Sequence, residues 1–145
     1  MTYNQIVTEL RKIMQSHAMI KQVKFATPVE WLSRDEQPTY PVACYAINAG
    51  QLNKGREQVF NVQIWFLDKS GAEAEFETDV VSDQMQIAAD IVSKLRIESN
   101  DWFVDNNINF DVISDKFEDY LAGVQLTFNI FTISNYDACD IPAAS

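Results

Sequence analysis

The sequence predicts an α+β fold with two layers, in which an antiparallel sheet of four to five strands carries two helices on one face. Two segments with apolar residues at every second position, 58–67 and 124–133, predict neighbouring strands at the centre of the sheet. Two other segments, 3–16 and 72–96, repeat apolar residues at three- and four-residue steps, as helices packed on a sheet do. The order of helix, strands, helix and strands is typical of an α+β domain.

The two central strands each have one fully apolar face and one mixed face. The fully apolar face carries Phe60, Val62, Ile64 and Phe66 in the first strand, and Val124, Leu126, Phe128 and Ile130 in the second. The apolar residues of the mixed face are Val59, Trp65, Leu67, Phe131 and Ile133. Because the helices cover one face only, this mixed face needs either a second subunit or a loop such as residues 29–40 to cover it.

The first half of the chain predicts a helix over residues 3–16, with Thr2 as its N-cap, and a short strand that ends before Thr27-Pro28. A strand over residues 42–48 follows. Residues 49–57 then predict a hairpin loop into the central strand, and this loop carries Lys54 and Arg56, two of only 11 basic residues.

The second half of the chain begins with a helix over about residues 72–96, whose first turns carry an acidic run, residues 73–79. Residues 97–107 form a polar, Asn- and Asp-rich stretch. Residues 108–112 alternate as a further strand, and residues 114–123 connect it to the strand over residues 124–133. The domain spans residues 1–145, and its last part, from about residue 134, is a C-terminal extension without periodicity.

Composition and charge restrict the function. The chain has 47% hydrophobic residues, which suffices for a core without disulfides or metal, and a net charge of −10. This charge argues against wrapping nucleic acid, which requires clustered Lys and Arg. No apolar run reaches the roughly 18 residues of a membrane span. Cys44 and Cys139 lie far apart in the chain, and we expect two reduced, partly buried thiols rather than a disulfide.

The residue types offer little for catalysis. His17, the single histidine, continues the apolar stripe of the first helix and is expected at the edge of the core rather than as a catalytic base. Cys139 with Asp137 and Asp140 is a weak metal pattern, and the acidic run lacks the glycine and oxygen spacing of a calcium loop. We therefore expect no catalytic residues, no cofactor and no metal.

The C-terminal half carries a family resemblance. The segments FEDYLAG at residues 117–123 and SNYDACDIP at residues 134–142, together with the order of elements, resemble tail terminator and tail-completion proteins of tailed bacteriophages. The resemblance implies a structural virion protein without enzymatic activity, assembled in the cytoplasm of the bacterial host. It implies a homo-oligomeric ring, commonly a hexamer, that contacts other head–tail or tail-tube proteins.

The expected subunit or tail-tube contacts combine the mixed sheet face with the predicted hairpin loop and the C-terminal extension. These candidate residues are Lys54, Arg56, Val59, Trp65, Leu67, Phe131, Ile133 and Tyr136. Two other classes stay open on the sequence alone. One is a host cytoplasmic adaptor, and the other is a small α+β enzyme with a pocket between helix and sheet.

Overall fold

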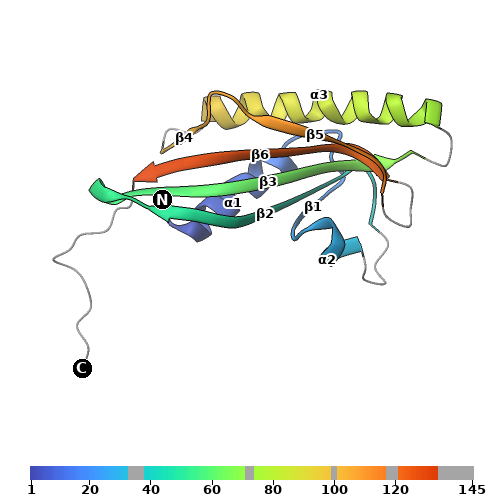
Figure 1. The fold of residues 1–145 in the computed structure, drawn as a ribbon. Helices are drawn as coiled ribbons and strands as arrows, with labels where there is room; N and C mark the ends of the chain where they lie inside the picture. Colours follow the sequence, from blue (N-terminus) through green and yellow to red (C-terminus); the bar gives the residue numbers. More distant parts are fainter. Residues whose placement is uncertain (33–37, 71–73, 99–100, 117–120, 134–145) are drawn as a thin grey trace.

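The computed structural model describes residues 1–32, 38–70, 74–98, 101–116 and 121–133 (Figure 1). In chain order its elements are α1 (Tyr3–Gln15), β1 (Gln22–Phe25), α2 (Pro28–Leu32), β2 (Val42–Leu52), the 3₁₀ turn η1 (Lys54–Arg56), β3 (Glu57–Lys69), α3 (Ala74–Glu98), β4 (Trp102–Val104), β5 (Asn109–Lys116) and β6 (Leu121–Ile133). Helices combine with one mixed sheet of six described strands, which confirms the α+β class.

One sheet contains all the described strands, in the order β1-β2-β3-β6-β4, and β5 pairs with β6 beside β4. The predicted central pair is confirmed, because β3 and β6 are antiparallel neighbours from Glu57↔Ile133 to Lys69↔Leu121. The described sheet differs from the prediction in two details. It has six strands, since β4 forms within the stretch expected to be polar, and β1 pairs with β2 in parallel.

The helices α1 and α3 pack on the same face of the sheet, as predicted. Figure 1 shows α3 running along β5 and β6, with α1 behind β2 and β3. The core between the layers joins Leu10 of α1 and Ile91 of α3 to Ile64 and Phe128 of the central strands. The predicted N-cap is also confirmed. Thr2 accepts a hydrogen bond from the Gln5 backbone N–H at 3.2 Å, and its own N–H donates to Gln5 Oε1 at 2.8 Å.

The hairpin between β2 and β3 is longer than the sequence predicted. Residues 49–57 were expected to be a loop, but Ala49 to Leu52 continue β2 by pairing with Asn61 to Gln58 of β3. The register shifts between Ile47 and Ala49, so Asn48 marks a β-bulge at the point where the predicted strand ends. The turn is therefore confined to Asn53 and η1, and two long paired strands carry it to one end of the sheet (Figure 1).

Asp68, near the end of β3, is a partly buried carboxyl group. Its pKa is raised above the ordinary 3.8, mainly because burial disfavours the carboxylate and also because Asp83 lies nearby, while the Lys69 N–H opposes both effects. The folded state therefore binds this proton more tightly than the unfolded state. The free energy of unfolding therefore falls as the pH rises from 3.8 through the folded-state pKa of Asp68. Below 3.8 the group does not reduce the stability.

We expect Asp68→Asn to raise the melting temperature at pH 7, by a gain in unfolding free energy of at most about 1 kcal/mol. The difference between variant and parent should shrink towards zero as the pH falls to 3.8 and below. Thermal unfolding curves at a series of pH values measure this difference. An Asp68→Asn variant less stable than the parent at pH 7 would contradict the assigned sign.

Candidate functional site

The second face of the sheet, opposite α1 and α3, is divided into a covered half and an open half. At the covered half, Trp31 of α2 packs in a cluster with Trp65 and Leu67, which are 9% and 0% exposed. Val42, Cys44, Ile113 and Leu121 complete that cluster. Here the segment around α2 covers the face, as in the loop alternative that the sequence left open. The structure therefore removes Trp65 and Leu67 from the expected subunit contacts.

The open half of the second face ends in a row of paired residues across four strands. Cross-strand pairing aligns Phe103 of β4 with Phe131 of β6, then Val59 of β3, then Gln51 of β2. Three of the four are apolar, but of these only Phe103 is well exposed: Phe131 is half-buried and Val59 is 9% exposed. Phe103 is 77% exposed, and next to this row Ile133 is 62% exposed. Exposed apolar side chains that gather in one patch mark interaction surfaces, whereas singly scattered ones need no explanation, so this row is the best candidate for an interaction surface.

Phe103 is not among the predicted contact residues, because Trp102–Val104 lies within the polar, Asn- and Asp-rich stretch of residues 97–107. The pattern was present in the three residues: Trp102 is 3% exposed and its Nε1–H donates to the Leu95 carbonyl at 3.2 Å. Val104 points to the same core, so Phe103 between them must point to the opposite face. Three residues are too few to distinguish a strand from a loop by alternation alone.

A shallow depression of about 370 Å³ adjoins the row of paired residues. The residues around it are Ala49, Gly50, Gln51, Asn53, Val59, Asn61, Asn129 and Phe131. Val59 and Phe131 supply its apolar part. Asn61 and Asn129 are joined across the strands by an Nδ2–H to Oδ1 hydrogen bond of 3.1 Å. The depression thus offers apolar contact beside uncharged amide groups and suits a side chain with both characters.

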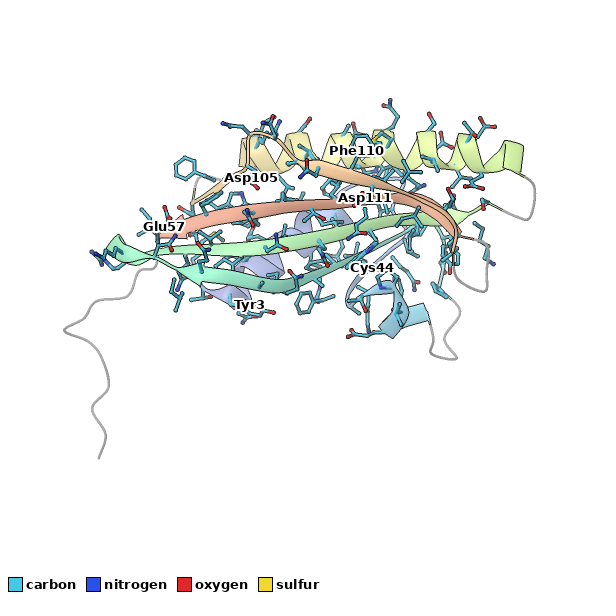
Figure 2. The ribbon with its side chains drawn as sticks, viewed as in Figure 1. Tyr3, Cys44, Glu57, Asp105, Phe110 and Asp111 are labelled. Atoms are coloured by element: carbon cyan, nitrogen blue, oxygen red, sulfur yellow. The ribbon has the colours of Figure 1, made fainter. Side chains whose placement is uncertain are left out.

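The turn beyond the depression carries the two predicted basic residues. Lys54 and Arg56 are exposed, and Gly55 and Arg56 have positive φ values of 74° and 65°. Asn53 closes the turn, because its N–H donates to the Glu57 carbonyl and its amide donates to the Glu57 carboxylate, both at 2.8 Å. Figure 2 shows Glu57 at this end of the sheet and Cys44 on the half beside α2.

Of the eight predicted contact residues, the structure brings five together at one end of the sheet: Lys54, Arg56, Val59, Phe131 and Ile133. Trp65 and Leu67 belong to the covered half. Tyr136 and the rest of the C-terminal extension lie outside the described residues.

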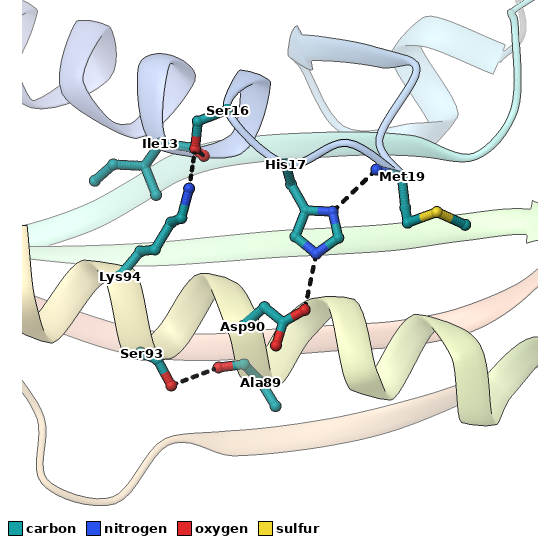
Figure 3. Close-up of polar contacts among 8 residues, drawn as sticks. All are labelled: Ile13, Ser16, His17, Met19, Ala89, Asp90, Ser93 and Lys94. Atoms are coloured by element: carbon teal, nitrogen blue, oxygen red, sulfur yellow. Dashed lines mark hydrogen bonds and ion pairs between the residues drawn. The ribbon is translucent and has the colours of Figure 1, made fainter.

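His17 has a structural role between α1 and α3 (Figure 3). Its Nδ1 accepts the Met19 N–H at 3.1 Å, so the ring proton is on Nε2, which lies 2.9 Å from Asp90 Oδ2. Lys94 of α3 makes a second connection by donating to the hydroxyl of Ser16. Both ring nitrogens of His17 are therefore engaged, at the edge of the core, as the helix pattern predicted.

Cys44 is a free thiol at 0% exposure, and burial raises its pKa to about 12. A thiol with this pKa is not a nucleophile near neutral pH. Its suggested partner, Cys139, lies outside the described residues. Within the described ranges, no three His, Cys, Asp or Glu side chains come together as metal ligands.

A larger groove of about 860 Å³ lies between α1 and the ends of β4 and β6. Its lining includes Glu9 and Lys12, which form an exposed ion pair at 3.5 Å, and Glu57 and Asp101 from the sheet side. The groove mixes charged, amide and aromatic side chains and is the nearest feature to the helix–sheet pocket expected of a small enzyme.

The fold and the open face define an α+β protein with two exposed apolar side chains, Phe103 and Ile133, at one end of its sheet. No protein-family model matches the chain, and no curated protein matches it. In the part of the chain that the structure describes, no helix combines the length and the apolar character needed to cross a membrane.

Proposed function

We propose that this chain is a structural virion protein of a tailed bacteriophage, which assembles into a ring at the head–tail junction or at the tail end. The observation that carries the proposal is the apolar patch at one end of the sheet, where Phe103 and Ile133 are exposed beside the half-buried Phe131. Exposed phenylalanine and isoleucine side chains in one strip favour association, because burial against a neighbour removes their apolar surface from water.

The family resemblance supplies the kind of assembly. It supports a homo-oligomeric ring, a hexamer in the usual case, whose other partners are head–tail or tail-tube proteins. The net charge of −10 suits such a ring, since carboxylates on a channel wall repel the phosphate backbone and let DNA pass. In this proposal the protein has no catalytic activity, and it is located in the virion after assembly in the host cytoplasm.

The row can be tested by light scattering after size-exclusion chromatography, over a range of protein concentrations. We expect a ring for the parent chain, alone or after addition of tail tubes. The double variant Phe103→Ser/Ile133→Ser should raise the dissociation constant at least tenfold, because it removes about 1.4 kcal/mol or more of contact free energy.

Phe110→Ser is the matched control, since Phe110 is also exposed, at 54%, but lies on the helix side of β5. The control should assemble like the parent. A chain that stays monomeric at high concentration, also with tail tubes present, would contradict the ring. Equal effects of the row variant and the control would remove the row from the interface.

A further inference from the structure

One edge of the sheet is open and unprotected. The outer side of β2 pairs with β1 only from Val42 to Tyr45, and no described strand lies beside Ala46 to Leu52. This open segment of β2 contains no proline and no charged residue, whereas the opposite edge strand, β5, contains Asp111 and Lys116. Edge strands are usually guarded by charges or proline, so an unguarded edge is suited to accept another strand.

The depression lies directly beside this open edge. Ala49, Gly50 and Gln51, which belong to the open segment, form one side of it. A strand added to β2 would place every second side chain on the same face as the depression. Backbone pairing and a receptor for one side chain therefore occur together, as they do in strand-addition complexes.

Charge and composition indicate what the edge accepts. Lys54 and Arg56 follow the open segment directly in a chain whose net charge is −10, so an acidic segment is favoured there. Residues 134–145 include Asp137 and Asp140 and no basic residue. They also include Tyr136, whose ring and hydroxyl match the apolar part and the amides of the depression.

The position where β6 ends agrees with residues 134–145 as the segment that the open edge accepts. β6 ends at Ile133, which pairs with Glu57, the first residue after the turn that carries Lys54 and Arg56. Residues 134–145 therefore leave the described structure at the end of the sheet where the open edge also ends. Eight residues of this extension, when fully extended, span roughly 26 Å. That length is enough to pair along the whole seven-residue open segment of β2, which is roughly 24 Å long.

We propose that residues 134–145 of a second copy of the chain add as a strand to the open edge of β2, with Tyr136 in the depression. This rests on the proposed assembly function and names the contact that would build it. The contact is heterologous, because the extension of one copy meets the edge of the next, and a repeated heterologous contact forms a ring when the rotation between copies closes.

Cysteine crosslinking in the full-length chain tests this arrangement, because Cys139 lies within the added segment. In an extended strand Cys139 is roughly 10 Å from Tyr136 and points to the opposite face, so a flexible bismaleimide of roughly 15–20 Å, which can pass around the edge of the added strand, should join it to a cysteine placed at Gln51→Cys. Gln86→Cys is the matched control, since Gln86 is exposed on α3, on the other side of the sheet. Cys44 does not interfere, because it is fully buried.

We expect a ladder of crosslinked dimers and larger species for Gln51→Cys, at a yield at least tenfold above Gln86→Cys. Tyr136→Ala in the Gln51→Cys background should lower that yield several-fold, and Tyr136→Phe should lower it less. The pair Lys54→Glu/Arg56→Glu should lower the yield most at low salt, where charge attraction is strongest.

The outcomes separate this inference from the assembly itself. If light scattering shows a ring but Gln51→Cys crosslinks no better than Gln86→Cys, the strand addition is overturned and the assembly stands. A crosslink confined to single chains shows that each copy covers its own edge, which overturns the exchange between copies. A monomer without crosslinks overturns both.

Discussion

Replacing Ile64 by alanine is expected to lower the free energy of unfolding by about 2–5 kcal/mol. Ile64 is 0% exposed and occupies the middle of β3, between Tyr45 of β2 and Leu126 of β6. Its side chain belongs to the core beneath α1 and α3, so the substitution leaves a cavity that the two layers cannot close. Urea unfolding at equilibrium measures the loss.

Ile133→Ala is the control for this prediction, because Ile133 lies on the second face and is 62% exposed. In the isolated chain it should change the unfolding free energy by no more than about 0.5 kcal/mol. A loss below about 1 kcal/mol for Ile64→Ala would show that the two faces of β3 have been assigned in reverse.

The central pair of strands was predictable because alternation over ten residues specifies both the strand and its buried face. Val62, Ile64 and Phe66 show this, as each is 0% exposed on the helix side. The amphipathic stripe of α1 was equally clear, and Ile6, Leu10 and Met14 are all fully buried. In such segments the period of the apolar residues decides the structure before any long-range contact is known.

Strand neighbours far apart in the sequence could not be predicted in the same way. The parallel pairing of β1 with β2 depends on the connection through α2, and β4 depends on a partner, Thr132, 30 residues after Trp102. The residues exposed on the candidate surface could not be predicted for the same reason. Trp65, Val59 and Ile133 look alike as apolar residues of the mixed face, and only the folded structure shows that Trp65 and Val59 are both 9% exposed while Ile133 is 62% exposed.

The substitution Gly123→Ala is expected to cost about 3 kcal/mol or more, which would leave much of the chain unfolded at moderate temperature. Gly123 is buried in β6 between Leu67 of β3 and Ile113 of β5. A Cβ at this position would lie 1.8 Å from the Phe66 carbonyl oxygen and 2.9 Å from its carbon. These are backbone atoms of the central strand, so the clash is relieved only if β3 and β6 separate.

Gly55→Ala separates this steric effect from the general cost of losing a glycine. Gly55 has a φ of +74°, but a Cβ there would meet nothing within 4 Å, so its substitution should cost only about 1 kcal/mol of backbone strain. Thermal and urea unfolding of both variants measure the difference. Equal losses for the two would show that β6 can shift away from β3 at Gly123. A much larger loss for Gly123→Ala would show that Gly123, the last residue of the FEDYLAG segment, is needed for the close approach of β3 and β6.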